Sequence, residues 1–383
     1  MTGGQPVDGL LTPESISHQL FGEGVIKIAI VTDELNKYQR DVNVSKITTL
    51  HDRKELDSIQ KNFRKIKGVT VIIYDQTCAT EKRRRRKRGL LEDPNKKVFI
   101  NSLVCEGCGD CSKKSNCISV EPIETEFGRK RKINQSSCNK DYSCVDGFCP
   151  SFITVEGANL KKKVILNKDN PINQLNKLPN PKQPYIIKPY NILVAGIGGT
   201  GVVTIGALIS MAAHLENKGI TVLDQVGIAQ KGGAVLSHIR IAQNQNTIFS
   251  AQIPDQSTNL LLGCDMVVSS SKDVKSLINQ NITNSVINDN MTPVAQSVLN
   301  PDFFYDTSLT KKIVKDTTFS ADFLNASEIS TKLFGNSIFG NIFLVGYCIQ
   351  KNLIPISIKS FEEAIRLNKS NIQENLNAFI WGR

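Results

Sequence analysis

The chain has 383 residues, of which 40% are hydrophobic and 22% charged, and its net charge is +11. This length allows two or three domains with separate cores, and the composition is typical of a soluble globular protein. The longest apolar run falls short of the roughly 18–20 residues of a membrane span and the N-terminus lacks a secretory signal, so a cytoplasmic protein is expected.

Residues 1–92 are predicted to form part of an α/β domain. The adjacent glycines of MTGGQP at 1–6 predict a tight loop, which is either an ordinary turn or a phosphate site. After it come a helix, a strand, a second helix and a buried parallel strand. The predicted elements are Pro13–Phe21 with Thr12 as N-cap, Val25–Thr32, Arg53–Ile66 ended by Gly68, and Val69–Tyr74. The last strand brings Asp75, Thr77 and Cys78 to the carboxyl edge of the sheet.

A run of seven basic residues, Lys82 to Arg88, supplies much of the positive charge. Such a run is typical of a solvated surface or of a nucleic-acid-binding patch. Because it lies between a predicted strand and a cysteine-rich segment, two other interpretations compete. It could attract an acidic redox partner, or it could neutralise anionic clusters and cofactor phosphates.

Residues 93–157 are predicted to form a ferredoxin-like iron–sulfur domain framed by strands at Val98–Ile100 and Ile153–Val155. Without a secretory signal, clustered cysteines indicate metal ligation rather than disulfides. The first three follow a C-x2-C-x2-C pattern with intervening glycines, and the last precedes Pro150. This spacing favours an iron–sulfur cubane over zinc, because one short loop must reach three corners of the cluster. The candidate ligands are Cys105, Cys108, Cys111, Cys117, Cys138, Cys144 and Cys149.

In two-cluster ferredoxins, each cubane takes three ligands from a C-x2-C-x2-C run and the fourth from a distant Cys-Pro. By the same pattern, one [4Fe–4S] cluster is expected to be held by Cys105, Cys108, Cys111 and Cys149. The other three cysteines leave several interpretations open. They are spare thiols, or they hold a second cluster with three irons or a non-cysteine fourth ligand, or Cys78 completes their set. Cys264 and Cys348 lie in apolar contexts and are expected to be core residues.

Residues 158–189 are rich in Lys, Asn and Pro and are predicted to be a linker. Residues 190–383 are predicted to form a second, Rossmann-like α/β domain, in which His214 and His238 are packed or surface residues. The predicted strands are Tyr190–Ala195, Ile220–Asp224, a half-exposed Leu236–Ala242 and Met266–Ser269. The predicted helices are Val202–Leu215, Ile338–Ile349 and Ser360–Leu367, the last with Ser360 and Glu363 as a capping box.

The motif GIGGTG at 196–201 joins the first of these strands to its helix and matches G-x-G-x-x-G. With Asp224 at the end of the next strand, it has the form of a dinucleotide-binding fingerprint. Glycines at a helix N-terminus will hold any phosphate-bearing ligand, however. A second glycine pair follows Gln230 and Lys231 and suggests another loop that faces the same ligand or a partner domain. The candidate ligand-binding residues are Gly196, Gly198, Gly199, Gly201, Gln230, Gly232 and Gly233.

Taken together, these segments resemble the fused indolepyruvate ferredoxin oxidoreductases of the 2-oxoacid:ferredoxin oxidoreductase superfamily. MTGGQP at 1–6 is similar to their thiamine-diphosphate loop, which implies roles for Thr2, Gly3, Gly4 and Gln5. YDQTCATEKRRRRKRG at 74–89 resembles the end of that domain. VCEGCGDCSKKSNC at 104–117 and SSCNKDYSCVDGFCPSF at 136–152 resemble its iron–sulfur insert. VAGIGGTGVVTIGALI, GIAQKGGAVLSHIRI and NLNAFIWGR resemble the gamma-type catalytic domain.

The resemblance implies that a 2-oxo acid such as indolepyruvate is decarboxylated on thiamine diphosphate with Mg²⁺. Coenzyme A then takes the acyl group, and two electrons leave singly through [4Fe–4S] clusters to ferredoxin. Implied partners are ferredoxin, the 2-oxo acid, and the remaining domains or a second copy in a homo-oligomer, with no membrane or nucleic acid. Pyruvate or a branched-chain acid is an alternative substrate.

The chain departs from the family in extent, because it has no upstream GDG motif and Met1 falls inside the MTGGQP loop. The expectation is a fragment that binds a cluster but does not catalyse the whole reaction alone. Two rival hypotheses come from other classes. One is a basic nucleic-acid-binding protein with a cysteine–metal module, and the other is an NAD-dependent subunit resembling electron-transfer flavoproteins.

Overall fold

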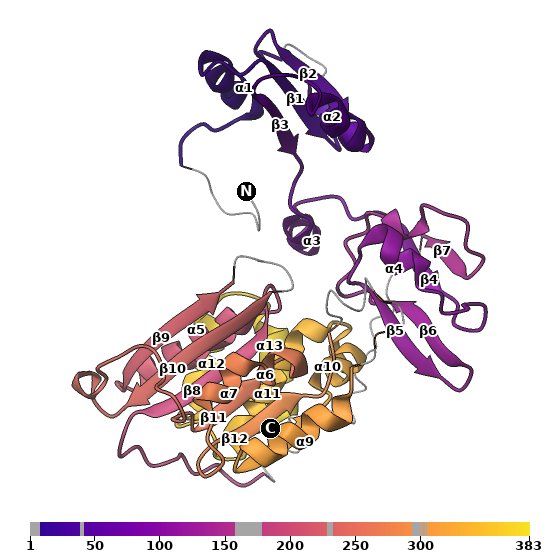
Figure 1. Ribbon diagram of the computed structural model, residues 1–383. Coiled ribbons are helices and arrows are strands. Elements are labelled where there is room, and N and C mark those ends of the chain that lie inside the picture. Colours follow the sequence, from indigo (N-terminus) through magenta and orange to yellow (C-terminus); the bar gives the residue numbers. More distant parts are fainter. Residues whose placement is uncertain are drawn as a thin grey trace. The chain divides into compact units, whose positions relative to one another are not determined.

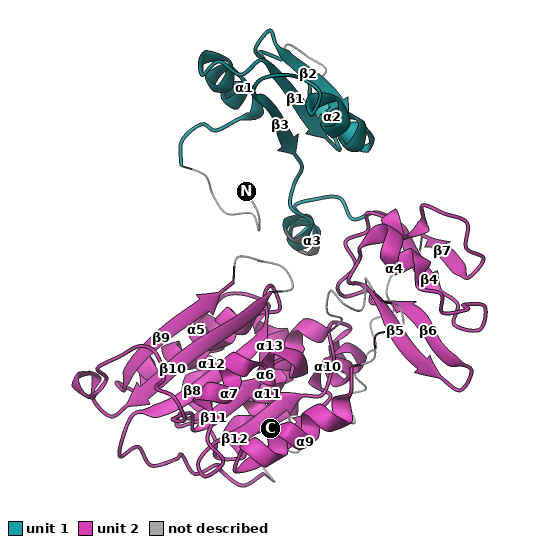
Figure 2. Ribbon diagram, viewed as in Figure 1, with its two compact units in different colours: residues 1–93 teal, residues 94–383 magenta. Residues whose placement is uncertain are grey.

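The structure is a computed structural model that describes residues 8–38, 42–157, 178–227, 233–292, 300, 303 and 305–383. The chain divides into two compact units, residues 1–93 and 94–383 (Figure 2). In the described part of the chain, no helix is both long and apolar enough to cross a membrane.

The first unit contains a three-stranded parallel sheet in the order β2-β1-β3 (Figure 1). Its centre is β1, whose Ala29 and Val31 pack against Ile59 and Phe63 of α2. This arrangement confirms the predicted parallel α/β half-domain. The elements are α1 Pro13–Gly22, β1 Lys27–Thr32, β2 Thr48–Asp52, α2 Leu56–Phe63, β3 Thr70–Asp75 and α3 Ala79–Lys87.

Three details of the first unit differ from the sequence prediction. Strand β2 was not predicted, because Thr48–Asp52 reads TTLHD and a short polar segment of this kind is weak evidence for a strand. Helix α2 ends at Phe63, before Gly68, which adopts a positive φ in the following loop. Strand β3 is partly rather than fully buried, because it is an edge strand of a small sheet.

The second unit begins with a small cysteine-rich insert made of two antiparallel strand pairs, β4 with β7 and β5 with β6. The pairing of β4 with β7 confirms both predicted framing strands. The elements of the insert are β4 Lys96–Ile100, α4 Asp110–Ser115, β5 Val120–Thr125, β6 Gly128–Ile133 and β7 Phe152–Glu156.

The rest of the second unit is built on a six-stranded sheet in the order β13-β12-β11-β8-β10-β9 (Figure 1). Strand β10 is antiparallel to both of its neighbours, whereas β8, β11, β12 and β13 are mutually parallel. The strands are β8 Tyr190–Ile197, β9 Gly219–Val226, β10 Ala234–Ala242, β11 Leu260–Gly263, β12 Asn284–Asn288 and β13 Ser320–Leu324. The helices are α5 Val202–Leu215, α6 Met266–Ser269, α7 Lys272–Leu277, α9 Thr307–Thr317, α10 Ala326–Phe334, α11 Gly340–Gln350, α12 Ile358–Leu367 and α13 Ile372–Gly382.

Helices cover both faces of this sheet, which explains why β8 is apolar at successive positions. Ile192 and Val194 pack into the cluster formed with α5, α11, α12 and α13. Leu193 and Ala195 point to the opposite face and pack with residues of α6, α7 and α9. Successive side chains of a strand alternate between faces, so a strand covered on both sides needs an unbroken apolar run. The predicted Rossmann-like α/β class is confirmed.

Met266–Ser269 was predicted as a strand but forms the short helix α6. The carboxylate of the preceding Asp265 accepts a hydrogen bond from the Val268 backbone N–H at 3.0 Å and caps the helix. The strand lies just upstream, at β11. A short apolar run does not distinguish a buried strand from a buried helical turn. Here the Asp265 cap favours the helix.

Strand β10 was predicted to be half-exposed, but its side chains are almost all buried. It lies between β8 and β9, and α5 packs against it on one face. On the other face the fully buried His238 accepts a hydrogen bond at Nδ1 from the Ile253 backbone N–H, at 3.3 Å. The predicted packed histidine is therefore confirmed at 238, whereas His214 is exposed on α5.

Helix α12 is capped by Ser357, not by the predicted Ser360. The Ser357 hydroxyl accepts a hydrogen bond from the Ser360 backbone N–H at 3.1 Å. We expect Ser357→Ala to lower the free energy of unfolding by about 1 kcal/mol, because a helix N–H loses its acceptor. Ser360→Ala should cost less than half as much. Urea denaturation of the two variants measures this difference, and an equal or larger loss for Ser360→Ala would contradict the assignment.

Candidate metal centre and glycine loop

The pairing of β4 with β7 brings together cysteines that are far apart in sequence. Ile100 and Phe152 are the last paired residues at one end of this ladder. Cys105 follows β4 by five residues, and Cys149 precedes β7 by three. The C-x2-C-x2-C loop and the Cys-Pro turn therefore leave the ladder at the same end.

These four cysteines line one cavity of about 270 Å³. A water-sized occupant needs only about 10–15 Å³ by this measure, so the cavity has room for a group far larger than one ion. Cys105 is buried, Cys111 is partly buried, and Cys108 and Cys149 are exposed, so the cavity opens to the surface. Other lining residues are Ile100, Val104, Glu106, Gly109, Asp110, Lys114, Arg131, Cys144, Asp146, Gly147, Phe148, Pro150, Ser151 and Phe152.

The glycines of the C-x2-C-x2-C loop are required by its backbone. Gly107 and Gly109 have φ values of +78° and +79°, a conformation that L side chains rarely adopt. A Cβ at Gly107 would also lie 2.2 Å from the Arg129 carbonyl oxygen of β6. The loop therefore packs directly on β6, and its curvature turns the Gly107 N–H to within 3.4 Å of the Cys105 Sγ. N–H groups directed at cysteine sulfurs are a recognised feature of iron–sulfur sites.

Burial and charge act in opposite directions on the thiol of Cys111. Burial raises the pKa of Cys111, while hydrogen bonds with Ser112 and, to a smaller extent, the nearby Arg131 guanidinium offset part of that rise. Ligation requires the thiolate, so a cation beside it favours the ligating form. Cys149 Sγ lies 3.0 Å from the Ser151 hydroxyl, which provides a further polar contact at the opposite side of the set.

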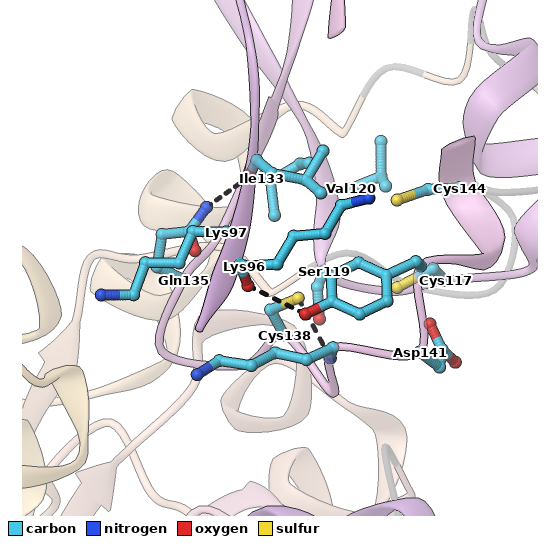
Figure 3. Close-up of a pocket in the computed structure, with 13 residues that line it drawn as sticks. Lys96, Lys97, Cys117, Ser119, Val120, Ile133, Gln135, Cys138, Asp141 and Cys144 are labelled. Carbon is cyan, nitrogen blue, oxygen red and sulfur yellow. Dashed lines mark hydrogen bonds between the residues drawn. The ribbon is translucent and has the colours of Figure 1, made fainter. Parts of the chain in front are cut away.

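The remaining cysteines, Cys117, Cys138 and Cys144, form a second group (Figure 3). Burial, and after it the neighbouring thiols of Cys117 and Cys138, raise the pKa of Cys144 to about 12. Burial also raises the pKa of Cys138, although its Sγ accepts a hydrogen bond from the Lys140 backbone N–H at 3.4 Å. The cavity at this group measures only about 10 Å³.

The two groups therefore differ in what they can hold. The first has four cysteines in the expected ligand pattern, a roomy cavity that Cys144 also lines, and an adjacent buried cation, and these features fit a [4Fe–4S] cubane. The second has three cysteines around a space for about one water, which does not fit a cubane as arranged. Within the described residues, no three His, Cys, Asp or Glu side chains converge on a single metal-ion position. Cys78 belongs to the first unit, where it precedes α3.

Cys264 and Cys348 are buried core residues, as predicted. Cys264 directly follows β11, and Cys348 lies inside α11. Burial holds the pKa of both thiols well above the ordinary value for cysteine. They are therefore neutral packing residues of the second sheet and not candidate ligands.

The glycine motif forms the predicted turn between β8 and α5. Gly199 and Gly201 have positive φ values, and a Cβ at Gly196 would lie 2.7 Å from Val202 Cγ2 and 2.9 Å from Cys264 Cβ. Gly201 is the N-cap of α5 and provides no side-chain hydrogen bond to the first turn. The backbone N–H groups at this helix N-terminus are therefore suited to an anionic ligand.

The sheet order separates Asp224 from this loop. In a dinucleotide-binding fold the acidic residue ends the strand adjacent to the glycine-loop strand. Here β10 lies between β8 and β9, and Asp224 is paired with Ser237 of β10. The acid is thus two strands away from the loop, about 9–10 Å in the hydrogen-bonding direction. This topology removes the geometric support for NAD that the motif provided.

Gly198 and Gly233 meet, because the Gly198 N–H donates to the Gly233 carbonyl oxygen at 2.8 Å. This contact brings Gly233 to the first glycine loop, and the prediction that the second pair faces the same ligand or a partner domain stays a prediction. Gln230 and Gly232 lie outside the described residues, as do Thr2, Gly3, Gly4 and Gln5. Their predicted ligand contacts stay predictions.

The basic run forms helix α3, and acidic neighbours partly neutralise it. Lys82 pairs with Asp33, and the Arg85 Nε donates to Glu81 at 3.0 Å. Glu81 also lies 3.9 Å from Arg84. The helix is thus tied into its own unit rather than presented as a uniformly unpaired basic surface.

Two polar residues at these sites were not predicted from the sequence. Arg131 lines the first cavity, and Asn341 of α11 donates from Nδ2 to the Thr200 carbonyl oxygen of the glycine loop at 3.0 Å. Neither belongs to a motif, and each reaches its site through a non-local contact. A buried-face position in the alternating strand GRKRKI was the only available signal for Arg131.

Residues 191–383, just over half of the chain, match the family described as pyruvate ferredoxin/flavodoxin oxidoreductase. Indolepyruvate oxidoreductase subunit IorB of Pyrococcus horikoshii is 26% identical over 202 residues, covering 51% of this chain and 95% of that protein. The subunit of the same name from Thermococcus kodakarensis is 25% identical with the same coverage.

Two solved structures are also similar over 51% of this chain. Pyruvate oxidoreductase subunit PORC of Thermotoga maritima has 16% identity, a TM-score of 0.38 and 95% of its own chain covered. The 2-oxoglutarate:ferredoxin oxidoreductase of Magnetococcus marinus, solved with 2-oxoglutarate, coenzyme A and succinyl-CoA, has 19% identity, a TM-score of 0.39 and 30% covered. The family match is thus confined to the second sheet, and the resemblance of residues 1–157 stays a prediction.

Proposed function

Because the chain belongs to the pyruvate ferredoxin/flavodoxin oxidoreductase family, we propose that it is part of an indolepyruvate-type 2-oxoacid:ferredoxin oxidoreductase. The proposed reaction converts an aryl 2-oxo acid and coenzyme A to acyl-CoA and CO₂. The two electrons released pass to ferredoxin. The observation that carries this proposal is the four-cysteine cavity of the insert, which the same chain joins to the family's oxidoreductase domain.

The proposed role of the insert is to carry the electrons. A [4Fe–4S] cluster bound there accepts and donates one electron at a time. Cys105, Cys108, Cys111 and Cys149 would hold it, and the exposure of Cys108 and Cys149 keeps the site close to the surface. The exposed Phe148 and Val104 at the cavity also suit a transient protein contact there. Ferredoxin is the proposed acceptor.

The proposed role of the second sheet is to bind a phosphate-bearing ligand, with coenzyme A as the candidate. The N-terminus of α5, the turn from Gly196 to Gly201 and Gly233 form the described part of this site. Asn341 holds the turn in place through Thr200. Thiamine diphosphate with Mg²⁺ is proposed to contact Thr2 to Gln5.

The substrate class rests on the similarity to the two IorB subunits. Pyruvate and branched-chain 2-oxo acids are the alternative substrates. Both relatives are named as subunits, so we propose that this chain also works with further parts of such an enzyme, or with a second copy of itself, in the cytoplasm. Incubation with candidate 2-oxo acids and coenzyme A, with the partner subunits present, distinguishes the substrates by the acyl-CoA formed.

Metal content tests the function most directly. The chain, purified without oxygen, is expected to be brown and to contain about four irons, because only the first cysteine group has room for a cubane. Iron and zinc are measured by elemental analysis, together with the absorption spectrum. A colourless chain that contains zinc would contradict the proposal and favour a nucleic-acid-binding module. Bleaching by NADH would instead favour an NAD-dependent electron-transfer subunit.

A further inference from the structure

Arg131 is the largest side chain in the described part of the chain that is almost fully buried, with 2% exposure. A guanidinium stays protonated in proteins, so this residue places a permanent positive charge inside the insert. Removing such a charge from water is costly unless negative groups compensate for it. A buried arginine in a small insert is therefore stable only with negative groups or hydrogen-bond acceptors around it.

The position of Arg131 identifies the site concerned. The side chain lines the cavity that contains Cys105, Cys108, Cys111 and Cys149. Strand β6 carries it, and the C-x2-C-x2-C loop packs directly on this strand where Gly107 meets the Arg129 carbonyl. The pairing of Arg131 with Pro122 of β5 fixes the register of the strand. The charge is thus held next to the loop by backbone contacts.

Arg131 lines the same cavity as the four cysteines, and it is the buried cation among the charged residues of that cavity. The other charged residues that line the cavity are Lys114, Glu106, Asp110 and Asp146. Asp146 and Glu106 are exposed, so water screens them more than it screens Arg131.

We propose that Arg131 is the internal counter-ion of the cluster held by Cys105, Cys108, Cys111 and Cys149, and that it raises the reduction potential of that cluster. Four thiolates and a cubane carry net negative charge, and each electron added increases it. A buried cation stabilises the reduced form more than the oxidised form, and net charge is one of the determinants of cluster potential. The proposal rests on the cluster assignment in the proposed function.

The test compares three variants of the whole chain, purified without oxygen. Arg131→Met removes the charge and keeps the length of the side chain, whereas Arg131→Lys keeps the charge. Lys132→Met is the matched control, because Lys132 is the next residue of β6, its side chain is 51% exposed, and it loses the same charge. The midpoint potential is measured by a redox titration followed by electron paramagnetic resonance, with iron content determined in parallel.

We expect Arg131→Met to lower the equilibrium constant for reduction at least tenfold, which is about 59 mV for one electron. Lys132→Met and Arg131→Lys should stay within a fraction of that shift. An unchanged potential in Arg131→Met, or an equal shift in Lys132→Met, overturns the proposal.

If Arg131→Met retains no iron, Arg131→Lys shows whether the site needs the charge or the shape of the Arg131 side chain. A near-native potential and iron content in Arg131→Lys then support the counter-ion, since the charge alone restores the site. Loss of iron in both variants shows a shape-specific packing role and overturns the proposal. A wild-type chain without iron contradicts the cluster assignment itself, which separates failure of the proposed function from failure of the role of Arg131.

Discussion

Cys105→Ala is expected to remove the cluster from the chain, and iron should fall from about four per chain to near zero. Cys105 is the buried member of the four-cysteine set, and its Sγ accepts the hydrogen bond from the Gly107 N–H. A cubane that loses one of its four thiolates at a buried corner is held less tightly, and water has little access there to replace the thiolate. Elemental analysis and the visible absorption of anaerobically purified protein measure the loss.

Two matched cysteine variants make this result specific. Cys264→Ala makes the same chemical change at a buried core cysteine of the second sheet and should leave the iron content unchanged. Cys117→Ala removes a member of the second group, whose cavity of about 10 Å³ lacks room for a cubane. It should also retain about four irons. Equal iron loss in Cys117→Ala and Cys105→Ala would contradict the assignment of the cluster to the first group.

Gly346→Ala is expected to lower the free energy of unfolding by about 2–3 kcal/mol, although alanine is the better helix former. Helices α11 and α13 pack closely through two glycines. A Cβ at Gly346 would lie 2.2 Å from the Phe379 carbonyl oxygen, and one at Gly382 would lie 2.0 Å from the Phe343 carbonyl oxygen. Both obstructing atoms are backbone atoms, so the helices must separate to admit a methyl group.

The chain has a single tryptophan, Trp381 on α13, which makes this prediction simple to measure. Its side chain packs against the core that the two helices share, so its fluorescence reports unfolding of this part of the molecule during urea denaturation. Gly227→Ala is the control, because its nearest described neighbour, the Ala234 carbonyl oxygen, is 3.6 Å away. That variant should stay within about 0.5 kcal/mol. Equal midpoints for the two variants would show that the helices accommodate the methyl group.

The two proposals for the insert are linked by the geometry of one strand. Strand β6 supplies the Arg129 carbonyl that requires a glycine at 107, and it also supplies Arg131 at the cavity. The loop proposed to bind the cluster and the cation proposed to balance its charge therefore lie on one strand. A change in the register of the β5–β6 hairpin would displace both together.

Features that depend on neighbouring residues could be predicted from the sequence. The apolar run of β8, the glycines that follow and the helix Val202–Leu215 were predicted with nearly the observed bounds. The spacing C-x2-C-x2-C with its glycines likewise predicted a tight loop, which the positive φ values of Gly107 and Gly109 confirm, and its ligand role stays a prediction. In each case, the local conformation depends on about ten neighbouring residues, because strand alternation, helix periodicity and glycine conformations are local properties.

Features that depend on pairing between distant segments are set by tertiary contacts. The ladder of β4 with β7 brings Cys149 to the loop at 105–111, whereas Cys117 and Cys138 line a second cavity and Cys144 lines both. The insertion of β10 between β8 and β9 moves Asp224 away from the glycine loop. Arg131 is an ordinary basic residue in the sequence and becomes a buried charge only when the loop packs on β6. Strand order and burial are set by non-local contacts, and a sequence read segment by segment does not contain them.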